Sequence, residues 1–330
     1  MNNKSETIDI ILPSRIGDCL LGLPALLCLK QLVEKFPEKK LKITVFSTSV
    51  LTEILKKLNL FEIKQFSNIQ KLRTIFNPSN KAIFLHTTMD NHCFFAKKTY
   101  GINITGKKIS YQNDMPYLYV DQTHKYIPES LFKHLKDNLD FSTCTISFFG
   151  MLLEIGFSPE EIIETFNFNE DSLDFEEEIT NWKPEIQNYV VICMEAAYGS
   201  KGDADRRFKE ESYFEVSKYI YDKFGLKSAF IGIDNIISLP EINYIYDFRK
   251  KLDFLQLAQL MKDSEGYLGN DTGPLHLANL MKKYSLGIYS RETAMKINYY
   301  PIFNNLNSPT LGFPEMDIVD NFCSKLVEKV

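Results

Sequence analysis

The sequence has few cysteines, and their spacing excludes the common zinc and redox motifs. Six cysteines occur among 330 residues; most lie inside apolar runs, and no two form a CxxC pair. His86, His92 and Cys93 lie near one another, but their spacing matches no common metal site. Such sparse cysteines are typical of proteins of the reducing cytoplasm, where we expect this one.

The sequence shows neither a secretion signal nor an obvious membrane span. Residues 1–9 are polar and lead into a strand-like run, without the basic stretch and apolar core of a signal. The longest apolar run, Cys144–Phe157, contains Thr145, Ser147 and Glu154 and is shorter than the about 20 residues that cross a bilayer. We expect it to form a buried helix.

Two nucleotide-binding fingerprints are missing. No GxGxxG occurs, so the dinucleotide-binding form of the Rossmann fold lacks its glycine pattern. Gly101–Lys108 (GINITGKK) is close to a P-loop, but Lys108 stands where a Ser or Thr would bind Mg²⁺, and no helix signal follows. We therefore reject a P-loop.

The charge balance argues against a general nucleic-acid binder. The net charge is −5 and the pI is about 5.7. The charge is unevenly distributed, because residues 1–140 hold 20 Lys/Arg and 13 Asp/Glu, whereas residues 141–330 hold 18 and 30. The first part of the chain is thus suited to an anionic partner.

What the sequence does contain is an alternation of short apolar runs with helix-period segments, which predicts parallel sheets with crossover helices. The expected strands are Ile8–Pro13, Leu41–Phe46, Lys81–His86, Tyr189–Met194, Lys227–Gly232, Asn243–Tyr246 and Tyr267–Gly269. The expected helices are Cys19–Phe36, Ser49–Leu60, Pro128–Phe168, Glu210–Phe224 and Phe254–Lys262. An acidic, poorly periodic stretch, Asn169–Pro184, interrupts the alternation.

This interruption predicts two α/β domains in tandem. We expect an N-terminal domain over residues 1–168, a linker over 169–185 and a C-terminal domain over 186–315. Residues 316–330 are amphipathic and predict a closing helix that packs back toward the N-terminal domain. Ligands of such sheets bind at the carboxyl ends of strands, so the loops that follow strands are where a site is expected.

The loop Gly269–His276 (GNDTGPLH) joins a predicted strand to a helix. Asp271 or Thr272 can act as N-cap, and Pro274 suits the first turn because its missing N–H would be unpaired there. The amides of Thr272 and Gly273, with the positive end of the helix dipole, form an anion site of the kind that binds phosphate. The alternative is a well-capped helix that binds nothing.

Two other loops carry candidate chemistry. In Ser14–Asp18, the carboxylate of Asp18 either caps the following helix or acts as a general base toward a bound hydroxyl. In Ser200–Arg207, an arginine fork suits a diphosphate. The alternative for Arg206 is pairing with nearby acidic side chains on a solvated surface.

Three segments together carry the signature of a known family. Ile10–Leu26 matches an opening strand, a Gly-Asp loop and a Pro-Ala-Leu helix, and Arg206–Tyr213 corresponds to a Lys-x-Trp-Pro loop that leads into a helix. Gly269–Ala278 (GNDTGPLHLA) agrees almost completely with an Asp-Thr-Gly-x-x-His signature. In these features the chain resembles glycosyltransferase family 9, the bacterial ADP-heptose:lipopolysaccharide heptosyltransferases.

The resemblance implies a GT-B fold, in which two Rossmann-like α/β domains face each other across a cleft. The first domain would bind the acceptor and the second the nucleotide sugar. The implied reaction is an inverting transfer of heptose, or a related sugar, from an ADP-sugar to a lipopolysaccharide-type saccharide. The ADP-sugar would be a co-substrate, and no metal or other cofactor is implied.

The resemblance also assigns roles to residues. Asp18 becomes the candidate general base, and Arg206 replaces the lysine that contacts the donor phosphates. Leu252 lies where the family contacts adenine. The other positions expected to bind the donor are Ser200, Asp234, Asp271, Thr272, Gly273 and His276.

Two departures from the family pattern leave the donor open. Phe208-Lys209 stands where the family usually has Trp-Pro, and Ser290-Arg291 stands where a Gly-Pro-Thr segment is usual. They permit transfer from a different nucleotide sugar. An alternative outside the enzyme class is a homologue that binds a nucleotide or saccharide without catalysis.

The implied acceptor is a lipid-linked saccharide that carries phosphate and carboxylate groups, which fits the basic first part of the chain. We expect a cytoplasmic enzyme with peripheral contact to the inner membrane and no nucleic-acid partner. The alternative for each basic residue is a solvated surface charge. The residues expected on the acceptor side are Arg15, Lys64, Arg73, Lys97 and Lys98.

Overall fold

The computed structural model divides the chain into two compact units, Met1–Ser172 and Leu173–Val330. The division falls within the segment expected to be a linker, although Trp182 already packs on the core of the second unit. The residues that the structure describes are 5–12, 16–47, 52, 55–56, 59, 61–65, 79–85, 96–103, 117–119, 127–139, 141–168, 182–195, 207–233, 237–292, 295 and 307–328.

The first unit contains a parallel sheet in the order β3-β2-β1-β4-β5-β6. β1 pairs in parallel with both β2 and β4, so the strand order reverses between β1 and β4. The strands are β1 (Glu6–Ile11), β2 (Leu41–Ser47), β3 (Glu62–Gln65), β4 (Ser79–Phe84), β5 (Ala96–Asn103) and β6 (Tyr117–Tyr119).

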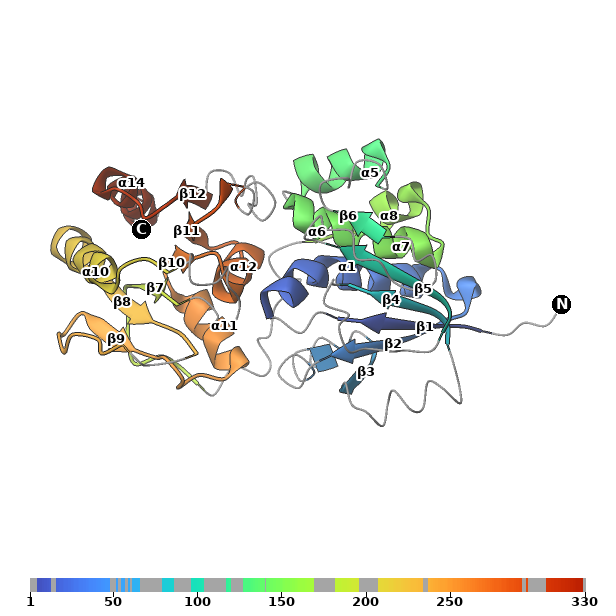
Figure 1. The fold of residues 1–330 in the computed structure, drawn as a ribbon, viewed down its shortest axis with the longest axis horizontal. Helices are drawn as coiled ribbons and strands as arrows, with labels where there is room; N and C mark the ends of the chain where they lie inside the picture. Colours follow the sequence, from blue (N-terminus) through green and yellow to red (C-terminus); the bar gives the residue numbers. More distant parts are fainter. Residues whose placement is uncertain are drawn as a thin grey trace. The chain divides into compact units, whose positions relative to one another are not determined.

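The long helix α1 (Ile16–Lys35) lies among the helices that cover this sheet, and it contacts α6 (Thr143–Phe148), α7 (Gly150–Ile155) and α8 (Pro159–Thr165) (Figure 1). The segment expected to be helical between residues 128 and 168 is divided into short pieces, because Ser142 and Ser158 act as N-caps and Gly156 ends a helix at a φ of 108°. The pieces are α5 (Glu129–Lys133), a π-helical turn (His134–Asn138), α6 (Thr143–Phe148), α7 (Gly150–Ile155) and α8 (Pro159–Thr165).

Among the described helices, α1 alone is long and apolar enough to cross a membrane by length and composition. Every residue from Cys19 to Leu26 is buried inside the first unit. Gly22 lies against the ring of Phe148 from α6, where an added Cβ would be 3.7 Å away. The apolar character of α1 is therefore accounted for by packing within the fold.

The second unit repeats the topology of the first. Its parallel sheet has the order β12-β11-β10-β7-β8-β9, which is the same order when the six strands are numbered along the chain. The order reverses between β7 and β10. The strands are β7 (Tyr189–Cys193), β8 (Lys227–Phe230), β9 (Ile245–Asp247), β10 (Gly266–Asn270), β11 (Tyr284–Tyr289) and β12 (Asn307–Leu311).

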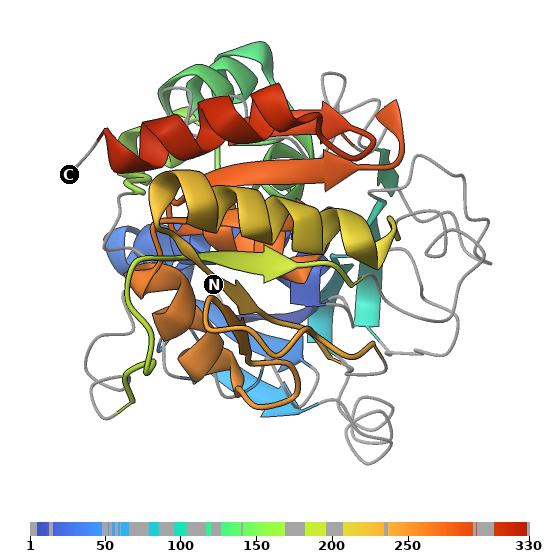
Figure 2. The same ribbon diagram turned by 90° about the vertical axis from the view of Figure 1, so that its left-hand side faces the viewer.

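Both faces of the second sheet are buried, because successive residues of its strands point to opposite faces. Val190 and Ile192 of β7 lie in the core beneath α10 (Glu210–Phe224) and α14 (Met316–Val327), whereas Val191 lies in the core beneath α11 (Phe254–Asp263) and α12 (Gly273–Leu280). Figure 2 shows α10 and α14 side by side over one face. Two parallel-sheet α/β units, as expected, are thus confirmed.

The closing helix α14 packs within the second unit. Its buried residues Val319, Phe322, Cys323 and Leu326 belong to the core that α10 shares. Its apolar stripe covers sheet surface beside β11. Packing of this helix back toward the N-terminal domain stays a prediction.

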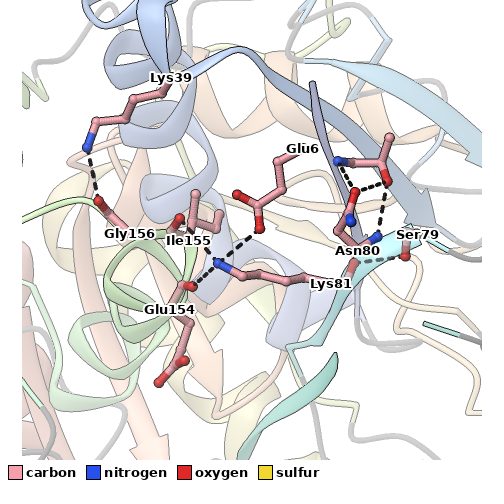
Figure 3. A network of polar contacts seen from close by, with 9 residues as sticks. Glu6, Lys39, Ser79, Asn80, Lys81, Glu154, Ile155 and Gly156 are labelled. Atoms are coloured by element: carbon pink, nitrogen blue, oxygen red, sulfur yellow. Dashed lines mark hydrogen bonds and ion pairs between the residues drawn. The ribbon is translucent and has the colours of Figure 1, made fainter. Parts of the chain in front are cut away.

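Two lysines hold the end of α7 at the amino edge of the first sheet (Figure 3). The Nζ of Lys81 donates to the carbonyls of Glu154 (2.9 Å) and Ile155 (3.5 Å) and pairs with the carboxylate of Glu6 (3.3 Å). The Nζ of Lys39 donates to the carbonyl of Gly156 at 3.0 Å. The last carbonyls of α7, which have no partner within a helix, are satisfied by these side chains.

Replacing Lys81 by methionine should destabilise the first unit. The variant keeps the length of the side chain but leaves half-buried carbonyls without their charged donor, which costs about 1.5–3 kcal/mol. Lys133→Met removes only an exposed pair with Glu129, so it should change stability by less than about 0.5 kcal/mol. Urea unfolding of both variants checks this; equal effects would contradict it.

Candidate functional site

The carboxyl ends of β7 and β10 lie side by side in the second sheet, at the point where strand order reverses. In doubly wound sheets, ligands bind outside the carboxyl ends of the strands at such a point. The segments that leave the sheet there begin at Met194 and Asp271. The second of them opens the GNDTGPLH loop.

A glycine allows β10 to approach β7 closely at this edge. A Cβ on Gly269 would lie 2.4 Å from the carbonyl oxygen of Cys193 and 2.7 Å from the hydroxyl of Tyr267. Both distances are shorter than a nonbonded contact allows. Glycine at position 269 is therefore required by the packing of the two strands that carry the loops.

The helix α12 begins at this edge, and the partners of its first amides can be followed among the described residues. Thr272 is its N-cap, but the Thr272 hydroxyl donates to the carbonyl of Asn270 (3.2 Å) and caps no helix amide. Pro274 has no N–H, and the N–H of Leu275 donates to the Thr272 carbonyl at 3.0 Å. Within the described part of the chain, no acceptor is found for the amides of Thr272 and Gly273.

These two amides lie at the positive end of the helix dipole, on residues that are half-buried. Unpaired helix amides of this kind bind anions such as phosphate. The structure also decides between the two candidate N-caps, because Thr272 and not Asp271 occupies that position.

The two other signature residues lie beneath the helix tip. Asp271 and His276 are buried, and the Nε2 of His276 lies 3.7 Å from the Oδ1 of Asp271. Their predicted role as direct donor contacts stays a prediction. The geometry shows an acid and an imidazole held together inside the loop that shapes the helix start.

Buried polar groups of the strands, which were not predicted from the sequence, contact the GNDTGPLH loop. The hydroxyl of Tyr267 donates to the carbonyl of Asn270 (3.3 Å), and the thiol of Cys193 lies 3.8 Å from the Thr272 hydroxyl. Burial raises the pKa of Cys193 to about 11, so the thiol is neutral near pH 7. Tyr213 of α10 also reaches this cluster, through the side chain of Asn270.

The ends of β7 and β8 are joined by a buried carboxylate. The Oε2 of Glu195 accepts the N–H of Ile233 at 2.7 Å. Gly232 makes room for it, because a Cβ there would lie 2.2 Å from the Glu195 carboxyl carbon. This carboxylate, two residues after the end of β7, was not among the predicted site residues.

The loop that carries Leu252 is held by an internal ion pair. Arg249 donates from Nε (2.9 Å) and Nη2 (2.9 Å) to the carboxylate of Asp247, and from Nη1 to the carbonyl of Ile237 (2.7 Å). These hydrogen bonds lower the pKa of Asp247. The N–H of Lys250 donates to the carbonyl of Gly232 at 2.9 Å, which brings the loop before Leu252 to the end of β8.

In the first unit, Asp18 is the third residue of α1 and follows β1. It thus lies beside the reversal between β1 and β4, and by strand order α1 corresponds to α10, the helix that follows β7 in the second unit. Asp18 is half-buried. Burial, and then the negative charge of Asp18, raise the pKa of its neighbour Cys19.

The described basic residues predicted for the acceptor side lie on strands other than β1. Lys64 pairs with Glu62 at 3.1 Å on the edge strand β3. β5 begins at Ala96, so the backbone of Lys97 and Lys98 lies at the amino edge of the sheet, opposite the edge that Asp18 follows. Predicted site residues that lie outside the described residues are Arg15, Arg73, Ser200, Arg206 and Asp234.

Among the described residues, no group of three or more His, Cys, Asp or Glu side chains is placed to hold a metal ion. His86, His92 and Cys93 lie outside that part of the chain. Independence from metal therefore stays a prediction.

A sequence profile of glycosyltransferase family 9 (heptosyltransferase) matches residues 152–316, half of the chain. The chain belongs to glycosyltransferase family 9. The matched range contains the α12 tip and the loops around it, but not Asp18. The resemblance noted in the sequence is thereby confirmed, and membership of this family assigns the chain to the glycosyltransferases.

Solved structures show the same fold at low sequence identity. E. coli heptosyltransferase WaaC with ADP is 13% identical, with a TM-score of 0.58, and the match covers 97% of this chain and 99% of that one. E. coli ADP-heptose lps heptosyltransferase II is 11% identical, with a TM-score of 0.57, and the match covers 98% of this chain and 99% of that one. The family 9 glycosyltransferase from Veillonella parvula DSM 2008 is 14% identical, with a TM-score of 0.58, and the match covers 100% of this chain and 99% of that one.

No curated protein sequence matches the chain. The structural likeness nevertheless confirms the expected GT-B fold for this family 9 member, because it extends over nearly the full length of both chains.

One departure from the family pattern has a clear structural role in this glycosyltransferase. Phe208, which stands where a tryptophan is usual, packs against Phe313 with ring centroids 6.0 Å apart. It belongs to the core beneath α10. An aromatic residue thus still anchors the segment that leads into α10, and the exposed Lys209 becomes its N-cap.

Gly269→Ala should prevent the second unit from folding properly. The added methyl group meets backbone of β7 that cannot move without breaking the sheet, so we expect a loss of at least about 3 kcal/mol. Gly22→Ala, where the nearest atoms are at 3.7 Å, should be tolerated. Thermal unfolding of the two variants compares them, and a Gly269→Ala protein as stable as the wild type would show that the strands are not so closely packed.

Proposed function

We propose that this glycosyltransferase moves a heptose from ADP-heptose to a saccharide of the lipopolysaccharide type, with inversion at the anomeric carbon. The observation that carries the proposal is the start of α12. There, at the reversal of strand order, no described residue provides an acceptor for the amides of Thr272 and Gly273. Such an anion site suits the diphosphate of a nucleotide sugar.

The donor half of the reaction requires that negative charge on the departing diphosphate be stabilised. The two amides and the dipole, which is equivalent to about half a positive charge at the helix start, are fixed before the reaction begins. Arg206, just before α10, would add a guanidinium fork. With these groups present, we propose that the transfer needs no metal ion.

The rest of the nucleotide would contact the loops after β8 and β9. Leu252 is half-buried and partly packed on the core, so it offers an apolar surface to an adenine ring. The Asp247–Arg249 pair holds its loop in place. This assignment of the base is supported by the position of the loop and by the family to which the chain belongs.

The acceptor half would use Asp18. Inversion requires an acceptor hydroxyl to attack the anomeric carbon from the side opposite to the leaving ADP, and a base within about 2.6–3.2 Å of that hydroxyl to take its proton. Asp18 is the half-buried carboxylate at the carboxyl end of β1. A lipid-linked acceptor would bring the enzyme to the cytoplasmic face of the membrane.

Asp18→Asn should lower the transfer rate by at least about a hundredfold, because an amide has nearly the size of the carboxylate but cannot accept the proton. The affinity for ADP should stay unchanged. Asp137→Asn, an exposed acid in the same unit, is the matched control. Product formation and calorimetric titration measure the two properties; unchanged turnover would remove Asp18 from the mechanism.

Arg206→Ala should weaken ADP binding about tenfold or more, since a charged hydrogen bond to phosphate contributes about 1.5–3 kcal/mol. Lys209→Ala is the matched control, because it also removes one positive charge, from an exposed side chain three residues further along the chain. It should change the affinity for ADP little. Equal affinities in a calorimetric titration with ADP would contradict the role of Arg206.

A different nucleotide sugar is the second candidate donor. Phe208-Lys209 and Ser290-Arg291 depart from the family pattern, and this observation favours it. Titration with ADP, UDP and GDP distinguishes the candidates: tighter binding of UDP or GDP would support the second. A homologue that only binds would show no turnover with any donor and no response to Asp18→Asn.

A further inference from the structure

A buried hydrogen bond joins the start of α10 to the strand that leads into α12. The hydroxyl of Tyr213 donates to the Oδ1 of Asn270 at 2.5 Å, and the Nδ2 of Asn270 donates to the carbonyl of Met194 at 2.9 Å. Tyr213 and Asn270 both have 0% exposure. The amide of Asn270 is thus satisfied by a helix on one side and by the end of β7 on the other.

The two partners belong to the two helix starts that flank the strand-order reversal. Tyr213 is the fourth residue of α10, and α10 follows the Arg206–Arg207 segment. Asn270 is the last residue of β10, two positions before the N-cap Thr272. The bond therefore links the segment after β7 with the segment after β10.

Apolar packing of the ring does not explain why residue 213 carries a hydroxyl group. The ring of Tyr213 packs edge-on against Phe313, with centroids 4.9 Å apart, and a phenylalanine ring could do the same. Burying a hydroxyl without a partner is costly, so the group is retained together with its acceptor. Burial raises the pKa of Tyr213 far above its usual range, so the phenol keeps the proton that it donates.

The carbonyl of Asn270 is fixed as well. It accepts from the hydroxyls of Tyr267 (3.3 Å) and Thr272 (3.2 Å). Any shift of the Asn270 side chain is therefore transmitted to the turn that sets the direction of the α12 amides. The position of Tyr213 in α10 and the direction of those amides are mechanically linked.

We propose that Tyr213 and Asn270 form a positioning pair that sets the spacing between the starts of α10 and α12. With the spacing fixed, the α12 amides keep the direction in which they bind one diphosphate. The inference rests on the proposed function for the identity of that ligand. Neither member of the pair needs to touch the nucleotide.

The test compares two variants that each remove one buried tyrosine hydroxyl. Tyr213→Phe breaks the pair, whereas Tyr189→Phe breaks the bond from Tyr189 to the Leu260 carbonyl (2.8 Å), elsewhere in the same unit. Calorimetric titration with ADP should show Kd raised about tenfold by Tyr213→Phe and unchanged by Tyr189→Phe. Both variants should lose a similar few degrees in thermal unfolding.

A second substitution keeps the proposal testable if Tyr213→Phe folds poorly. Asn270→Ala removes the other partner and should raise the Kd for ADP at least as much. In that background Tyr213→Phe should add no further loss, because the two residues act through one bond. Additive effects would overturn the pairing.

Amide hydrogen exchange separates failure of this inference from failure of the proposed function. Without nucleotide, Tyr213→Phe should speed exchange at residues 272–276, and Tyr189→Phe should not. A wild-type protein that binds no ADP but shows this linkage would overturn the proposed function alone. Wild-type ADP affinity in Tyr213→Phe, with unchanged exchange at residues 272–276, would overturn the positioning pair alone.

Discussion

The close approach of β10 to β7 is the constraint on which the second unit depends. It requires a glycine at position 269, since any side chain would meet the backbone of Cys193. It also brings the last residue of β10 to the carbonyl of Met194. The loops that leave these two strands therefore start from adjoining points, and α12 begins there with two amides for which no described residue provides an acceptor. The proposed anion site is a consequence of strand packing as much as of the loop sequence.

The same topology serves both units with different chemistry. Each sheet reverses its strand order beside its first strand. In the first unit the helix that follows carries Asp18 in its first turn, whereas in the second the helix beyond the reversal begins with Thr272-Gly273-Pro274. A carboxylate suits proton removal, and bare amides suit phosphate. Under the proposed function, one architecture thus supplies a general base in one half and an anion-binding helix start in the other.

Much of this was predictable from local pattern. The helix Glu210–Phe224 was predicted with the bounds that the structure shows, because an amphipathic run lies between acidic first-turn residues and Gly225. The GNDTGPLH loop was predicted to be a helix start for similar reasons. By contrast, β5 was not predicted, because AKKTYGIN lacks the apolar run by which buried strands are recognised.

Tertiary contacts account for what the sequence could not reveal. The partners Tyr213 and Asn270 are 57 residues apart, and neither the tyrosine nor the asparagine is unusual in its own segment. The choice between Asp271 and Thr272 as N-cap depended on backbone dihedrals. The side on which α14 packs depended on which part of the sheet α10 leaves uncovered, and amphipathicity alone does not specify that.

Each unit has its own sheet and its own set of buried residues, and the described donor-side elements all lie between Cys193 and Leu280, inside one of them. Substitutions that alter nucleotide preference can therefore accumulate in one half without disturbing the core of the other. Under the proposed function, substitutions that change the donor sugar and substitutions that change the acceptor would fall in different units, so the two specificities would change independently.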